Sequence, residues 1–183
     1  MTEFMFKRKG IFLSFIVSIF LYIAFSADAD AQFLKRSLAS APEVKIELST
    51  ATAHYSSLFG EGDDNSSIIR GVSRYGRLII DPGGNSNPVR YDNEEQVIFI
   101  MGGTGILSYG KEDIPVSKND FMYIPRGMEF SLSNPREQPL TVLLMGFRLK
   151  PETCTGKTAG LMIANTVELK FQTLPSHGPT TQF

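Results

Sequence analysis

Residues that could do chemistry are few in this chain of 183 residues, and the most suggestive group is the acidic pair Glu94-Glu95. Paired carboxylates suit general acid–base catalysis. Adjacent residues on an extended strand point to opposite faces, so at most one of the two carboxylates enters a common interior. The two histidines, His54 and His177, lie far from this pair in the sequence, and we expect them at the surface. The single cysteine, Cys154, excludes an internal disulfide.

The elements that position these residues are expected to be short strands. Glycine and proline are frequent (16 and 10 residues), and turn sequences separate the apolar runs. A parallel sheet would need crossover helices, and the sequence contains no convincing amphipathic helix. The sequence therefore predicts an all-β, antiparallel sandwich or barrel. The expected strands are the alternating segment 44–48 and the runs 68–80, 96–101, 106–109, 114–116, 121–124, 130–132 and 140–149.

Two segments in the middle of the chain carry a family resemblance. Residues 88–105 run from a polar turn through an uncharged strand to the turn Gly102-Gly103-Thr104-Gly105, and residues 119–134 form a second segment of similar design. Together they resemble the two motifs of the cupin family, small antiparallel β-barrels of the jelly-roll type. The resemblance implies a cupin barrel over residues 67–150.

The first cupin motif commonly holds two histidines, a glutamate and a glycine. Glu95 and Gly102 match its last two positions, with six residues between them. The histidine positions then fall on Val89 and Tyr91, and the alternative spacing of the motif supplies no histidine either. The first motif therefore keeps its turn and loses its nitrogen ligands.

The second cupin motif commonly runs from a glycine through a proline, a glycine and a histidine to an asparagine. Pro125, Gly127 and Asn134 match it, whereas Asn119 stands at the opening glycine and Phe130 at the histidine. In metal-binding cupins, three histidines and the glutamate hold one divalent ion, and imidazole provides much of the affinity. We therefore expect neither a metal nor another cofactor in this barrel.

Strand alternation predicts which side chains share the interior with Glu95. The expected pocket is apolar and aromatic with one carboxylate and one phenol, which suits a small organic ligand. A filled core with a hydrogen-bonded glutamate is the alternative. The opposite strand faces, at Ile98 and Ile100, are apolar as well, so we expect cover from a second subunit or a second barrel. The expected pocket residues are Val89, Tyr91, Glu95, Val97, Phe99, Met101, Phe130 and Leu132.

The two ends of the chain are expected to lie outside the barrel. Residues 1–31 combine a basic start, an apolar run and the small residues Ala29 and Ala31, which predicts a signal peptide; a retained membrane anchor is the alternative. The protein would then be exported, periplasmic or secreted, without membrane contact after cleavage. Residues 32–66 form a spacer with the first strands, and 151–183 an irregular extension or interdomain connector in which 161–169 make a strand or a short helix. The 18 basic and 19 acidic residues argue against nucleic acid as a partner.

Taken together, these features favour a non-enzymatic barrel that binds a small molecule or serves as the structural half of a two-barrel assembly, such as the first half of a bicupin. We expect a homodimer or pairing with a second cupin barrel. The alternative is an enzyme, because some cupin-like isomerases and epimerases work without metal through a base and a tyrosine. The resemblance then assigns Glu95 as base and Tyr91 as proton donor, with Tyr123 as an alternate donor. A metal-dependent dioxygenase or decarboxylase is the third hypothesis.

Overall fold

The computed structural model describes residues 35–60, 71–150 and 160–170 of the chain. Apart from one 3₁₀ turn, η1 (Leu38–Ser40), the regular elements in these ranges are strands, which confirms the predicted all-β class. The strands are β1 (Glu43–Val44), β2 (Ala53–Gly60), β3 (Val72–Ile80), β4 (Val89–Arg90), β5 (Glu94–Gly102), β6 (Thr104–Tyr109), β7 (Glu112–Ser117), β8 (Asp120–Ile124), β9 (Glu129–Ser133), β10 (Leu140–Arg148) and β11 (Met162–Asn165).

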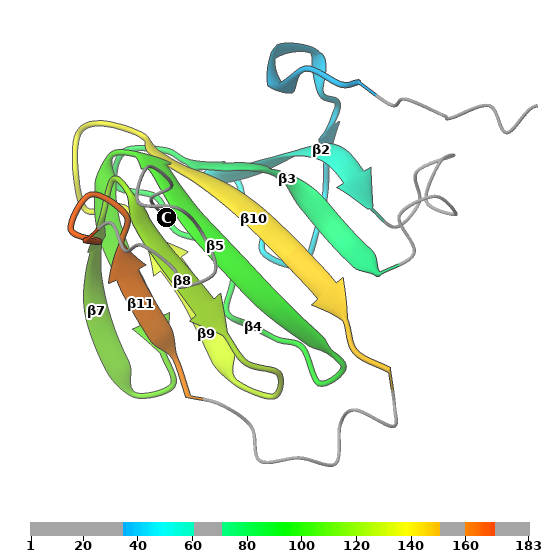
Figure 1. The fold of residues 1–183 in the computed structure, drawn as a ribbon. Coiled ribbons are helices and arrows are strands. Elements are labelled where there is room, and N and C mark those ends of the chain that lie inside the picture. The colour runs from blue at the N-terminus through cyan, green and yellow to red at the C-terminus, as the bar shows by residue number, and fades with distance from the viewer. Residues whose placement is uncertain (1–34, 61–70, 151–159, 171–183) are drawn as a thin grey trace, which may run out of the picture. The chain divides into compact units, whose positions relative to one another are not determined.

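The strands form two antiparallel sheets. The seven-stranded sheet has the order β1-β2-β3-β10-β5-β8-β11, and the four-stranded sheet has the order β4-β9-β6-β7. Figure 1 shows β10 lying between β3 and β5, strands that come much earlier in the sequence. Every strand pair in the described residues is antiparallel, and the chain passes between the two sheets several times. This arrangement is the predicted jelly-roll barrel.

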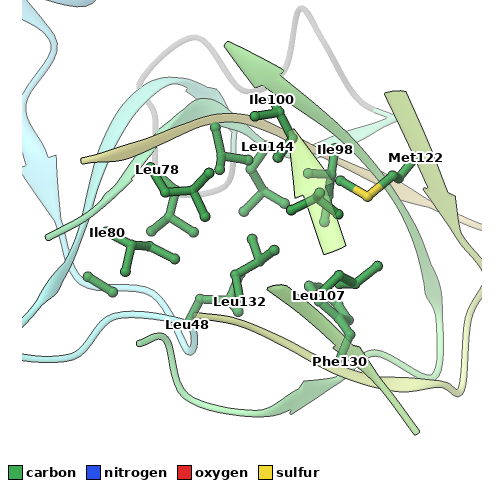
Figure 2. Packing of buried hydrophobic residues seen from close by; sticks show 14 of the residues in the cluster. Leu48, Leu78, Ile80, Ile98, Ile100, Leu107, Met122, Phe130, Leu132 and Leu144 are labelled. Atoms are coloured by element: carbon green, nitrogen blue, oxygen red, sulfur yellow. The ribbon is translucent and has the colours of Figure 1, made fainter. Parts of the chain in front are cut away.

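An apolar core fills the space between the two sheets. Each buried aliphatic or aromatic side chain in it contributes roughly 1.5–3 kcal/mol of transfer free energy, so this core is the main source of stability. Figure 2 shows side chains of the two sheets pointing toward one another, each at most 1% exposed: Leu107, Phe130 and Leu132 from the four-stranded sheet, and Ile98, Ile100, Met122 and Leu144 from the seven-stranded sheet.

The first strands differ from the expectation for residues 44–48. Only Glu43–Val44 form a strand there, and Leu48 is fully buried in a turn closed by a hydrogen bond from Ser49 N to Ile46 O. The longer strand is β2, which pairs with β3. A β-bulge between Ser57 and Phe59 breaks the alternation of side chains in β2, and this break hides the strand from the sequence pattern.

Several turns require a left-handed backbone, and those of the two motifs are among them. Gly103 has φ of 81° and Gly127 has φ of 76°, a region that residues with a Cβ rarely adopt. Asn119 also has φ of 76° and is the one non-glycine residue with positive φ in the described ranges. Asparagine tolerates this conformation better than most residues. The second motif therefore keeps its opening turn although it has lost the usual glycine.

The chain after the barrel contributes one more strand. β11 pairs with β8, which settles the alternative between strand and short helix for residues 161–169. The predicted signal peptide, Cys154 and His177 lie outside the described residues. No helix in the described part of the chain has the length and apolar character needed to cross a bilayer.

Candidate functional site

Strand β5 turns the face opposite to the expected one toward the core. Gln96, Ile98 and Ile100 are buried, whereas the alternate residues are only half-buried on the other face of the sheet. The expectation that Glu95 points into the barrel is therefore wrong. Residues 91–93 bend between β4 and β5, so the alternation of side chains that starts at Val89 does not continue into β5. The residues placed on the outer face are Glu95, Val97, Phe99 and Met101.

The adjacent glycines at the end of β5 explain this shift in register. Gly103 has positive φ, and a Cβ on it would lie 2.5 Å from the carbonyl oxygen of Pro139. A Cβ on Gly102 would meet nothing within 4 Å. Gly103 is thus the glycine that the turn requires, and six intervening residues lead back from it to Gln96 rather than to Glu95. The inward position of the motif's acid holds an uncharged amide.

The remaining predicted pocket residues lie at the core. Val89, Phe130 and Leu132 are buried in it, and Tyr91 is half-buried against it, with 6.3 Å between the ring centroids of Tyr91 and Phe130. Val89, Tyr91 and Phe130 occupy the positions where the family commonly has histidines, so side chains without imidazole nitrogens fill this part of the barrel. Their role as ligand contacts stays a prediction.

The candidate catalytic residues Tyr91 and Glu95 are not brought together. The Tyr91 hydroxyl donates a hydrogen bond to Glu47 Oε2 at 3.2 Å. Glu95 Oε1 accepts one from the Tyr123 hydroxyl at 2.6 Å, on the outer face of the sheet. Tyr91 and Glu95 therefore lie on different sides of the sheet and cannot contact the same substrate.

A buried arginine that the sequence did not single out organises one end of the interior. The Arg74 side chain is 10% exposed, and its Nη1 donates to Glu94 Oε2 at 2.5 Å and to Gln96 Oε1 at 3.4 Å. The amide of Gln96 also donates to Glu94 Oε2, at 3.2 Å. The guanidinium lies 4.1 Å from the ring centroid of Tyr91, within reach of a cation–π interaction. We call Arg74, Glu94, Gln96, Tyr91 and Glu47 the Arg74 cluster.

Glycine makes room for this cluster. Arg74 pairs with Gly146 on β10, and Gly146 pairs with Gln96 on β5, so the three lie in one row across the sheet. A Cβ on Gly146 would come within 2.8 Å of Arg74 Cγ and 3.0 Å of Arg74 Nη1. The missing side chain at Gly146 lets the guanidinium extend along the row to Glu94 and Gln96. Strand glycines often mark such close approaches.

An open cavity of about 240 Å³ borders the cluster. Segment 44–47 and strands β2 and β3 line it, with Arg74 in the wall. Two residues that line it, Tyr55 and Ser73, have hydroxyls with almost no solvent-accessible surface, Tyr55 Oη against Gly76 and Ser73 Oγ against Gly146. Neither hydroxyl forms a hydrogen bond of good geometry within the described residues, although Ser57 and the Tyr75 backbone lie near the phenol. A buried polar group without a partner costs about 1–3 kcal/mol. A bound molecule could satisfy these hydroxyls only if their side chains turned toward the cavity.

Burial keeps the phenols of this region protonated. Loss of hydration raises the pKa of Tyr55 to about 12, although the positive charge of Arg74 opposes the shift. Burial also raises the pKa of Tyr91 well above its usual value of 10, with Arg74 opposing and Glu47 and Glu94 adding to the rise. Both hydroxyls are consequently hydrogen-bond donors at neutral pH rather than bases.

The donor set does not fit a resident metal ion of the kind the cupin motifs suggest. Among the described residues, no group of three or more histidine, cysteine, aspartate or glutamate side chains could hold an ion. The motif positions carry Val89, Tyr91, Gln96 and Phe130, which together offer one phenol and one amide. Neither is a strong ligand for a transition metal.

Comparison with known proteins agrees with the resemblance carried by the two motifs. Residues 76–146 match the family model of the cupin domain. A search of curated proteins found no match to the chain.

Solved structures agree with this fold. A predicted oxalate decarboxylase from Thermotoga maritima is similar with a TM-score of 0.55 and 15% identity, covering 63% of this chain and 100% of that one. Protein Ylba from E. coli is similar with a TM-score of 0.62 and 13% identity, covering 78% of this chain and 58% of that one. The cupin domain of Cnp3 from Schizosaccharomyces pombe has a TM-score of 0.51 and 14% identity, covering 64% and 75%. Identities this low establish the fold alone.

Proposed function

We propose that this cupin barrel is a non-enzymatic binding protein that holds a small organic molecule in the open cavity beside Arg74. The cavity joins apolar surface from Val44 and Ile46 to the charged groups of Lys45 and Arg74. Ligand pockets typically combine apolar walls with a few well-placed polar groups. Its volume of about 240 Å³ suits a molecule of few heavy atoms.

The observation that carries this proposal is that two residues lining the cavity, Ser73 and Tyr55, have buried hydroxyls. Folding has removed these hydroxyls from water without giving either a well-formed hydrogen bond among the described residues. A ligand with a polar head group toward which these side chains turn would recover part of the free energy lost by burying them.

A catalytic role has less support. Tyr91 and Glu95 contact different partners on different sides of the sheet, and Tyr123 and Glu95 form their pair on the outer face. The motif residues Val89 and Phe130 are buried in the packed core. We also propose that the barrel works without a metal, since Val89, Tyr91 and Phe130 stand where the family has histidines.

Export and self-association remain part of the proposal. Export rests on the composition of residues 1–31. Pairing with a second copy or a second barrel is supported by the exposed aromatic residues Phe121 and Phe147 on the outer face of the seven-stranded sheet, 41% and 36% exposed. Apolar groups of this size at the surface are typical of interaction sites.

The experiment is a thermal-shift screen of the purified full chain against small organic acids, amides, alcohols and amines. Ser57 lines the cavity, so Ser57→Leu fills it, whereas Ser56 is the neighbouring residue on β2 and does not line it. At least one compound should raise the melting temperature of the wild type and of Ser56→Leu but not of Ser57→Leu.

Two results would contradict the proposal. The first is that no compound distinguishes Ser57→Leu from Ser56→Leu. The second is near-stoichiometric iron, nickel or manganese in the purified protein, which would show that a metal site exists despite the missing imidazoles.

A further inference from the structure

We propose that the cavity beside Arg74 recognises small carboxylic acids with a compact apolar body, and that the carboxylate of Glu47 occupies the recognition position until such an acid displaces it. This inference rests on the proposed binding function and names its ligand class. The Arg74 cluster and the cavity carry it together.

The charges around the cavity favour an anion. Lys45 and Arg74 both line it, and Glu47 is the only acidic residue among the described residues that do so. If Glu47 moves away, Lys45 and Arg74 face the space and no carboxylate remains among the residues that line it, while Glu94 still pairs with Arg74 Nη1. The net positive charge that remains attracts an anion, more strongly at low ionic strength.

The contacts of Glu47 show which atoms would recognise the acid. A single oxygen, Glu47 Oε2, lies 3.7 Å from Arg74 Nη2 and accepts a hydrogen bond from the Tyr91 hydroxyl at 3.2 Å. Guanidinium and phenol donors that converge on one oxygen are a typical arrangement for binding a carboxylate. The protein therefore already contains a carboxylate in the position that we assign to the ligand.

The two carboxylates on Arg74 have different roles. Glu94 binds Nη1, its side chain is only 14% exposed, and it also accepts from Gln96, so it fixes the arginine in place. Glu47 faces Nη2, and its side chain is 62% exposed in the turn that precedes β2. An exposed ion pair of this length is weak. Moving the Glu47 carboxylate away from Arg74 therefore costs little free energy, whereas moving the Glu94 carboxylate away costs more.

The rest of the cavity fits the body of such an acid. Val44, Ile46 and Tyr55 supply apolar and aromatic surface, and Ser73 lines the same space. A cavity of about 150 Å³ is large enough for benzene. The space of about 240 Å³ here accommodates a benzene ring with a carboxylate attached.

The test uses benzoate and its uncharged analogue benzamide, titrated calorimetrically into the purified full chain. The wild type should bind benzoate more tightly than benzamide. Glu47→Gln removes the internal competitor and should tighten benzoate binding about fivefold, the factor expected for releasing a weak exposed ion pair, while benzamide binding stays unchanged. Glu137→Gln is the matched control, because it removes one negative charge at an exposed turn outside the cavity; it should change benzoate affinity less than twofold.

The outcomes separate this inference from the proposed function. If Glu47→Gln alters benzoate affinity no more than Glu137→Gln does, or if benzoate binds neither protein, the inference is overturned. The binding function survives that result if another compound shows the difference between Ser57→Leu and Ser56→Leu. If benzoate binding persists undiminished in Ser57→Leu, the ligand is elsewhere and both proposals fail.

Discussion

The barrel interior has two regions of opposite chemistry, although the same strands supply both. On β3, Leu78 and Ile80 enter the apolar core, whereas Arg74 lies at the polar end. On β5, Ile98 and Ile100 enter the core, and Gln96 begins the polar end. The change from apolar to polar side chains occurs at the same height of the sheet on both strands, because Arg74 and Gln96 lie in one row through Gly146. The comparison separates what holds the fold together from what could recognise a ligand.

The apolar region should respond most strongly to loss of volume. Phe130 is 1% exposed and packs between the sheets. Phe130→Ala leaves a cavity that the surrounding side chains fill only in part, so it should lower the free energy of unfolding by about 3–5 kcal/mol. Chemical denaturation of both proteins measures the difference. A loss below about 1 kcal/mol would mean that the core is loosely packed and that the contrast between the regions is overstated.

The polar end should respond to an unbalanced charge rather than to volume. Glu94→Met leaves the buried Arg74 without its main carboxylate and should cost about 3 kcal/mol. The double variant Arg74→Met/Glu94→Met removes both charges and should recover most of that loss, because a well-packed apolar pair often replaces a buried ion pair without penalty. Equal destabilisation in the single and double variants, measured by denaturation, would show that packing and not charge dominates this end.

Surface charges should have a smaller effect on the free energy of unfolding than either region of the interior. The hydrogen bond that His54 Nδ1 donates to Glu43 Oε1 at 2.9 Å, together with the charges of Glu43 and Asp81, raises the pKa of His54 above its usual 6.5, while slight burial opposes this. Protonated His54 therefore adds stability that is complete below that usual value and is lost as pH rises through the raised pKa. The stability difference between wild type and His54→Gln should shrink between about pH 5.5 and pH 8.5. A difference that grows over this interval contradicts the assignment.

The fold was predictable because turn residues report backbone geometry directly. The proline and glycine of the second motif occupy the turn at Pro125 and Gly127, and Asn119 adopts the conformation that the missing glycine would have had. Alternation and turn spacing also predicted most strands after residue 71. β2 was missed because its bulge interrupts the alternation on which such a prediction depends.

The sequence does not decide which face of β5 points into the barrel. Both faces of residues 97–101 are apolar, so hydrophobicity does not distinguish them. The choice between Gly102 and Gly103 decides the register, and only the backbone conformation identifies Gly103. Arg74 carries no local signal, because its burial depends on Gly146, which is 72 positions away along the chain.

Strand β11 has a consequence for any shortened form of the protein. It covers the outer edge of β8, with Asn165 reaching Asp120 at 2.8 Å and the Thr166 backbone amide donating to Asn119. Without residues 160–170, β8 would present its free amides and carbonyls to other molecules, and such an edge is a template for aggregation. β11 is itself the last strand of the sheet, so the free edge in the full chain is a strand of 4 residues rather than β8 with 5, and short edge strands are less prone to such pairing.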